Sequence, residues 1–237
     1  MKSLTVTKYK RASILTIIII TGLSVIIGCS LASTTDLEIP VQITTYGEAW
    51  DGILAFGLFQ YDPDDIWTEQ HDYLIIMDTE GTIHYIRDTN PKSYNIVNLI
   101  EPGTILFNGE PRNSLNILNT TTGKISLLPQ KLGHHDAKYN PDTGNILTLQ
   151  KHIVTIEDMK YEHDRLVEID PEGNILWSWT TADYFSHELA CEYSVINKNS
   201  LDLTHCNSID WDKENNVAYV NIRNLNTFCK INTTTGE

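Results

Sequence analysis

A short pattern recurs along the chain: an apolar segment, a tight turn that ends in glycine, and a second segment. The turn glycines are Gly81, Gly123, Gly173 and Gly236, so successive turns lie 42, 50 and 63 residues apart. Apolar segments around such a turn predict a β-hairpin. Hairpins at this spacing are typical of β-propeller blades, which are four-stranded antiparallel sheets, with insertions lengthening the later repeats.

The fold class expected from this pattern is all-β: a β-propeller of which residues 51–237 supply about three and a half blades. The hairpins would be the outer two strands of each blade, and other segments would begin inner strands that line a central channel. The stretch 180–201 breaks the repeat and is expected to form a long loop over one face. Because apolar sheet faces are buried only when the ring closes, we interpret the chain as a truncated sequence or as one part of a split protein.

Two histidine segments share one register in this repeat. His135 lies seven residues before Asp142, His205 lies seven residues before Asp212, and a turn and an apolar strand follow each aspartate. Equivalent positions of neighbouring blades face one shared space, so we expect a polar site that contains both histidines. His134 is the alternative to His135 as the inward-facing residue, although the register favours His135.

The residues beside these histidines leave two questions open. Asp136 and Asn207 either orient the imidazoles or form turns. No metal ion is expected, because His134 and His135 are adjacent and would point to opposite faces of a strand. No cofactor is indicated either.

The composition restricts the partners. The net charge is −14 without a basic stripe, which argues against nucleic acid as a partner. Cys191, Cys206 and Cys229 form no CxxC pair, so they are either one disulfide with a free thiol or three free thiols. Trp177 and Trp179 alternate along one segment, which favours packing between blades over a ligand-binding platform. The sequence does not indicate an oligomeric state.

The N-terminus has the pattern of an export segment. Four basic residues among the first eleven precede an uncharged, Ile-rich run over residues 12–32, which is about long enough to span a bilayer. Within it, aliphatic residues followed by Gly28 and Cys29 resemble a bacterial lipobox. Residues 1–32 are therefore a lipoprotein signal with a lipidated Cys29, an uncleaved membrane-anchor helix, or a secretory signal. Residues 33–50 would be a tether, and all three interpretations put the remainder on the outer face of the cytoplasmic membrane.

Three features of the sequence resemble the arylsulfotransferase family, the aryl-sulfate sulfotransferases that do not use PAPS. They are the motifs Gly133-His134-His135-Asp136 and Thr204-His205-Cys206-Asn207-Ser208-Ile209, and Arg223. The resemblance extends from about residue 48 to the end of the sequence. It implies a six-bladed propeller with its active site at the channel mouth. In this family a nucleophilic histidine accepts a sulfuryl group from a phenolic sulfate ester and passes it to a phenol. By this resemblance His135 and His205 match the supporting histidines, and Arg223 matches the sulfuryl-binding arginine.

The same resemblance implies that the nucleophilic histidine lies in a later blade, beyond residue 237. The chain is then an N-terminal fragment that is expected to be inactive alone. The chemistry itself needs no metal or cofactor, since a guanidinium fork binds sulfuryl oxygens and imidazoles exchange the phenol proton. The alternative is a non-catalytic extracytoplasmic propeller that serves as a binding module. The sequence identifies neither donor nor acceptor.

Overall fold

The computed structural model describes most of the chain from residue 51 onward. The described residues are 51–62, 65–88, 96–101, 103–109, 114–128, 133–191, 194, 196–197 and 200–237, with two short strands, β1 (Ser3–Leu4) and β2 (Ile43–Thr44). Apart from these two short strands, the residues predicted to form the signal or anchor, the lipidated Cys29 and the tether lie outside the described residues. Among the residues that are described, no helix is long and apolar enough to cross a membrane.

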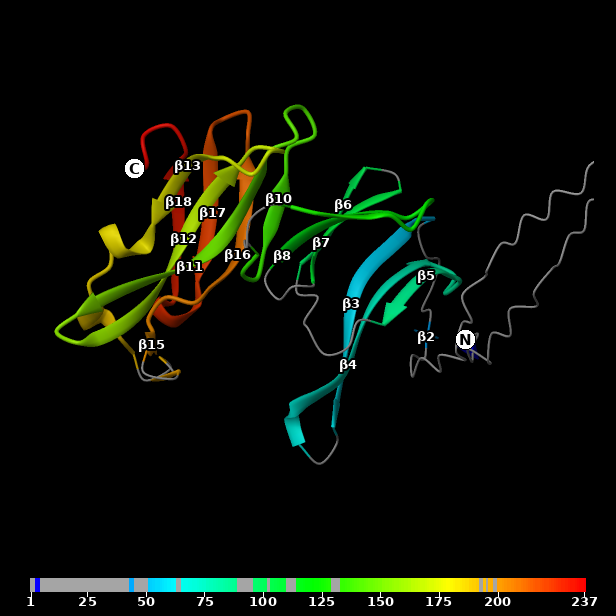
Figure 1. Cartoon of the computed structure of the whole chain (residues 1–237), viewed down its shortest axis with the longest axis horizontal. Coiled ribbons are helices and arrows are strands. Elements are labelled where there is room, and N and C mark those ends of the chain that lie inside the picture. Colours follow the sequence, from blue (N-terminus) through cyan, green and yellow to red (C-terminus); the bar gives the residue numbers. More distant parts are fainter. Residues whose placement is uncertain are drawn as a thin grey trace, which may run out of the picture.

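From β3 onward, the described strands form four sheets in chain order; in Figure 1 the first lies toward the right, the second near the centre, and the third and fourth overlap at the left. The first contains β3 (Ile53–Asp62), β4 (Asp65–Asp78) and β5 (Ile83–Asp88). The second contains β6 (Val97–Glu101), β7 (Thr104–Gly109), β8 (Ser114–Asn119) and β9 (Ile125–Leu127). The third is built on β10 (Ala137–Tyr139), β11 (Ile146–Ile156), β12 (Met159–Ile169) and β13 (Ile175–Thr180). The fourth contains β16 (Cys206–Asp212), β17 (Val217–Ile222) and β18 (Thr227–Asn232).

The all-β class is confirmed, and so are the glycine-turn hairpins. Gly81 joins β4 to β5, Gly123 joins β8 to β9, and Gly173 joins β12 to β13. Their φ angles are +94°, +69° and +89°, a left-handed region that glycine enters without a steric penalty. Within the part of the chain that the structure describes, the sheets form an open series rather than a closed ring.

The stretch 180–201 has, in its described residues, more regular structure than the long loop expected from the sequence. It contains the 3₁₀ turns η1 (Thr181–Asp183) and η2 (His187–Leu189), and the short strands β14 (Ile196–Asn197) and β15 (Ser200–Asp202). The hydroxyls of Thr180 and Ser186 cap the two turns by accepting backbone N–H bonds. β15 pairs with β12 in parallel, and this pairing carries the chain to the start of β16.

Alternation along the strands explains why these segments are almost continuously apolar. On β4, Leu74 and Ile76 pack against Ile105 and Phe107 of β7, whereas the intervening Ile75 faces the opposite side of its sheet. Successive side chains of a strand point to opposite faces. A sheet with neighbours on both sides therefore needs apolar residues at consecutive positions.

The third and fourth sheets bury the apolar cluster nearest the histidines. Leu147, Leu166 and Trp179 from the third sheet meet Val220 of β17 there, with Trp177 packed at the border. The predicted packing role of the two tryptophans is thus confirmed. The described cysteines Cys191, Cys206 and Cys229 are free thiols rather than members of a disulfide.

The first strands of consecutive sheets lie next to one another. β3 contacts β6, β6 contacts β10, and β10 contacts β16. Asn98 Nδ2 donates to the carbonyl of Ala137 at 2.6 Å, and the Ile209 N–H donates to Asp136 Oδ2 at 3.0 Å. The first bond holds the second sheet beside the start of the third, and the second bond holds the start of the third sheet beside the fourth.

Candidate functional site

The site lies where β10 and β16 begin. His135 and His205 stand at equivalent points, just before these two strands, with φ angles of +64° and +49°. A left-handed backbone is unusual for a residue with a side chain and costs about 1–2 kcal/mol. Their Nε2 atoms are 3.0 Å apart, and their ring centroids are 4.8 Å apart. The two rings thus share one space, as their common register predicts, whereas their role in a reaction stays a prediction.

His134 joins this pair. Its ring centroid lies 4.1 Å from that of His135 and 5.7 Å from that of His205. The expectation that His134 and His135 point to opposite faces is wrong, because these residues form a bend before β10 rather than part of a strand. We refer to His134, His135 and His205 together as the imidazole cluster.

Asp202 orients one ring of the cluster. Its Oδ2 bonds Nδ1 of His205, and β15 holds the carboxylate in place. Burial opposes ionisation of this carboxyl, but the hydrogen bond from His205 and nearby cations outweigh it, so its pKa is lower than usual. An ionised carboxylate only accepts hydrogen bonds, so His205 carries its proton on Nδ1. In neutral His205 the Nε2 atom is then an acceptor, and His135 donates to it from its own Nε2.

Asp164, on β12, ties the two histidine segments together. Its Oδ2 accepts the Thr204 hydroxyl and the Cys206 N–H, each at 2.7 Å. Its Oδ1 lies 3.6 Å from Nε2 of His134. Burial raises the pKa of the Asp164 carboxyl and is only partly offset by these hydrogen bonds. One buried carboxylate thereby reaches the residue before His135 and the residue before His205.

The pKa values of two members of the cluster are lowered. Burial is the largest cause for both, followed by the positive charge that a neighbouring imidazole would carry. The pKa of His134 falls to about 3 and that of His135 to about 4. Both rings are therefore neutral near pH 7, and the contact between His134 and Asp164 is not an ion pair there.

Two cations border the imidazole cluster. Arg223 begins the 3₁₀ turn η3 (Arg223–Leu225) directly after β17, and its backbone N–H donates to the His205 carbonyl at 3.2 Å. Its Nε donates to Asn224 Oδ1 at 3.0 Å, and the side chain is exposed. Lys151, on β11, pairs with Glu162 at 2.5 Å. Both cations contribute to the lowered pKa of His135, so they act on the same space.

The residues that orient the cluster differ from those considered in the sequence. Asp136 does not bind an imidazole: it accepts the backbone N–H groups of Ala137 and Ile209 and pairs with Lys138. Asn207 is exposed at a β-bulge. The orienting carboxylates are Asp202 and Asp164, which the sequence analysis did not single out.

The missed residues differ in how well the sequence signals them. Asp202 lies three residues before His205, a separation short enough to suggest an aspartate–histidine pair. Asp164 and Lys151 come from the middle strands of the third sheet, far from either histidine segment in sequence. Only the packing of that sheet against β16 brings them to the site.

Consecutive sheets that bring three imidazoles together just before β10 and β16, with Arg223 directly after β17, define an all-β repeat protein with a polar site. The family model for arylsulfotransferase (ASST) matches residues 49–237 of this chain. The chain therefore belongs to the arylsulfotransferase family. No curated protein sequence matches it.

Proposed function

We propose that this protein transfers a sulfuryl group from a phenolic sulfate ester to a phenolic acceptor. The family match indicates an arylsulfotransferase-like function in general. The observation that carries the specific proposal is the pair of imidazoles, His135 and His205, in contact at 3.0 Å beside Arg223. These are the residues that resemble the supporting histidines and the arginine of the family.

The charges around the imidazole cluster suit a sulfuryl group. The non-bridging oxygens of such a group carry negative charge, and a guanidinium offers them a planar fork of donors. The exposed side chain of Arg223 is available for this, and the Lys151 ammonium adds positive potential. The low pKa of His135 keeps its ring neutral, so that it donates a hydrogen bond at one nitrogen and accepts one at the other.

The reaction proposed has two half-steps. In the first, a histidine nitrogen attacks sulfur, a nitrogen–sulfur bond forms, the ester S–O bond breaks, and the phenolate leaves with a proton from an imidazole. In the second, the acceptor phenol gives its proton back to that imidazole, its oxygen attacks sulfur, and the nitrogen–sulfur bond breaks, which restores the free histidine. The family resemblance implies a nucleophilic histidine in a later blade, so His135 and His205 serve as supporting proton donors and acceptors.

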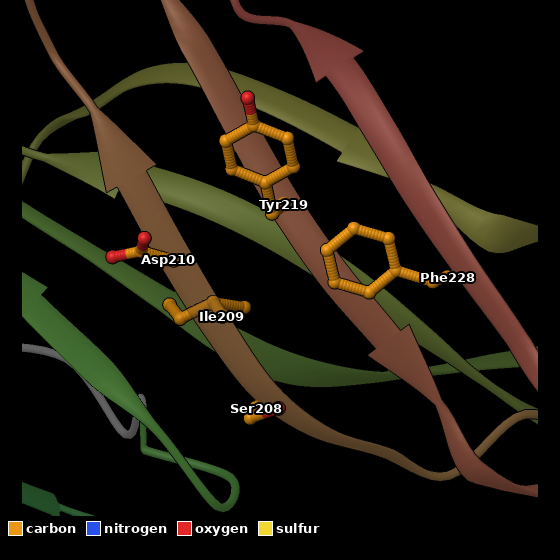
Figure 2. A pocket seen from close by; sticks show the side chains of 5 residues that line it. All are labelled: Ser208, Ile209, Asp210, Tyr219 and Phe228. Atoms are coloured by element: carbon orange, nitrogen blue, oxygen red, sulfur yellow. The ribbon is translucent and has the colours of Figure 1, made fainter.

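We also propose that the four sheets are successive blades of a six-bladed propeller. The adjacency of their first strands and the burial of both faces of the inner sheets support this arrangement. The outer face of β16–β18 carries a stacked pair, Tyr219 and Phe228, with ring centroids 5.7 Å apart (Figure 2). Phe228 is 67% exposed, so this face is suited to packing against a further blade.

We propose, in addition, that the protein is exported and held at the outer face of the cytoplasmic membrane through residues 1–32. The support is the basic, then apolar, N-terminal pattern ending at Cys29. Cell fractionation of the wild type and of Cys29→Ser tests this. Release of the variant from the membrane supports a lipid anchor, and retention supports an anchor helix. A soluble cytoplasmic wild type contradicts both.

The activity is tested with the protein that includes the later blade, using a chromogenic aryl sulfate as donor and phenol as acceptor. We expect phenol-dependent release of the chromophore. His205→Ala and Arg223→Ala should each lower turnover by about 10²–10³-fold, because each removes a charge or proton contact made in the transition state. His84→Ala is the matched control, since His84 lies on β5 and contacts Asp78. Unchanged turnover in both site variants would falsify the assignment, and a folded protein without any release favours the binding module.

A further inference from the structure

We infer that the imidazole cluster is a binding site for a divalent transition-metal ion of the Zn²⁺ class. Each of its three histidines offers one nitrogen, and these nitrogens all lie within 4.8 Å of one another. The three rings come from two sheets, so the site exists only in the folded chain. Imidazole is a preferred ligand of zinc, copper and nickel, whereas oxygen ligands suit magnesium and calcium.

The distances fit a tetrahedral ion after small movements of the rings. Zinc binds imidazole nitrogen at about 2.0–2.1 Å, which puts two ligand nitrogens roughly 3.3 Å apart. The Nε2 atoms of His135 and His205 are 3.0 Å apart, so an ion between them needs only a slight separation of the two rings. His134 must approach further, and it stands on the same bend as His135.

Carboxylates behind the rings supply the orientation that metal-binding histidines require. A ligating histidine usually donates its other N–H to a carboxylate or carbonyl, which holds the ring in place. Asp202 bonds Nδ1 of His205 in this way and leaves Nε2 for the ion. Asp164 lies 3.6 Å from Nε2 of His134, which leaves Nδ1 of that ring. His135 needs only to shift its proton from Nε2 to Nδ1.

The surroundings allow an ion to enter and leave a position for solvent. The side chains of His134 and His205 are 14% and 17% exposed. Three protein ligands with a water in the fourth position is the arrangement found in zinc sites that react with substrates. Lys151 and Arg223 place positive charge near the rings and oppose a cation, whereas Glu162, which pairs with Lys151, and Asp202, which pairs with His205, place negative charge there.

This site is separate in chemistry from sulfuryl transfer, although it uses the same rings. An ion at the cluster occupies Nε2 of both His135 and His205, the atoms proposed to exchange the phenol proton. Bound metal should therefore inhibit sulfuryl transfer rather than support it. Metal binding does not depend on that activity, so each can be found without the other.

The test is a titration of the metal-free full chain with Co²⁺, which reports tetrahedral coordination through its visible absorption. We expect one Co²⁺ per chain, displaced by Zn²⁺. His135→Ala and His205→Ala should each weaken the affinity by at least about a hundredfold, and Asp202→Asn by about tenfold to a hundredfold. His84→Ala is the control and should bind as the wild type does. Absence of stoichiometric Co²⁺ binding, or binding that both cluster variants retain, overturns the inference.

A second measurement needs no variant and so does not depend on how a variant folds. X-ray absorption at the zinc edge of the wild-type Zn²⁺ complex should give a first shell of nitrogen and oxygen with the outer scattering of imidazole. Sulfur in that shell would assign the ion to a cysteine and reject the histidine site. Sulfuryl transfer unaffected by saturating Zn²⁺ would likewise show that the ion is bound elsewhere.

Discussion

The segments that carry His135 and His205 share a left-handed backbone at the histidine but have different surroundings. Both histidines adopt a left-handed conformation just before the first strand of a sheet. The preceding residue is His134 in one segment and Thr204 in the other, and both approach Asp164. Only His205 has a carboxylate on its Nδ1, whereas the polar partner found for Nε2 of His135 is the other imidazole.

This difference shows how a repeat becomes an asymmetric site. The repeated turn brings two equivalent rings to one place. The stretch 180–201, which interrupts the repeat, leads into β15 (Ser200–Asp202), and the last residue of that strand, Asp202, bonds one ring alone. Equivalent positions thereby acquire different hydrogen bonds. His205 has a defined tautomer, and this tautomer makes His135 the donor in the hydrogen bond between the two Nε2 atoms. Four changes test this comparison, taken from the largest expected effect to the smallest.

Replacing Asp164 should affect both segments at once. Asp164→Ala leaves the buried Thr204 hydroxyl and Cys206 N–H without their acceptor, so we expect a loss of about 3 kcal/mol in the free energy of unfolding. Asp164→Asn keeps an acceptor oxygen and should lose less. Urea denaturation measures both. Asp136→Ala, a less buried carboxylate, is the comparison, and an equal loss there would contradict a special role for Asp164.

Replacing Asp202 should affect only the second segment. Asp202→Asn removes the ionised acceptor from Nδ1 of His205 and releases the constraint on its tautomer. In the proposed sulfuryl-transfer assay, we expect about a hundredfold lower turnover with little loss of stability. Proton–nitrogen NMR of the imidazoles reports the tautomer directly. A Nδ1–H signal of His205 that persists in the variant would count against this orientation.

The low pKa of His135 predicts acid sensitivity. The unfolded chain takes up this proton near pH 6.5 and the folded chain only near pH 4, so the unfolded state binds more protons in between. Stability should fall as pH decreases through this window, by roughly 1 kcal/mol from pH 6.5 to pH 5 for a partly exposed ring. Denaturation in the presence of a chelator compares the wild type with His135→Gln. The raised pKa of Asp164 has the opposite effect on stability, but this residue is present in both proteins. Identical slopes of stability against pH in the wild type and in His135→Gln would refute the prediction.

The left-handed backbone predicts the smallest effect. His205→Gly removes the ring and also relieves the steric cost at φ +49°, whereas His205→Ala removes the ring and keeps the cost. The greater backbone entropy of glycine in the unfolded state offsets part of this gain. The glycine variant should therefore be more stable than the alanine variant by about 0.5 kcal/mol. The same pair at His135 should behave alike. An alanine variant as stable as the glycine variant would indicate that the backbone relaxes.

Much of the fold follows from local patterns in the sequence. Asp78, Asn119 and Asp170 begin tight turns in which their side chains accept backbone N–H groups, and a glycine completes each turn. These turns, with the apolar runs beside them, predict the hairpins and the all-β class. The stretch 180–201 could not be predicted in the same way, because its strand β15 is held by pairing with a distant strand, β12.

Part of the candidate site likewise follows from the sequence, and part depends on the tertiary structure. The sequence by itself determined that two histidines occupy one register of the repeat, because register depends on residue spacing along each segment. It misplaced His134, because an alternation rule for strands does not hold in a bend. Only the tertiary structure decided that Asp164, Asp202 and Lys151 surround these rings. Burial, pKa and hydrogen-bond partners depend on which sheets pack together, and that packing joins residues far apart in the chain.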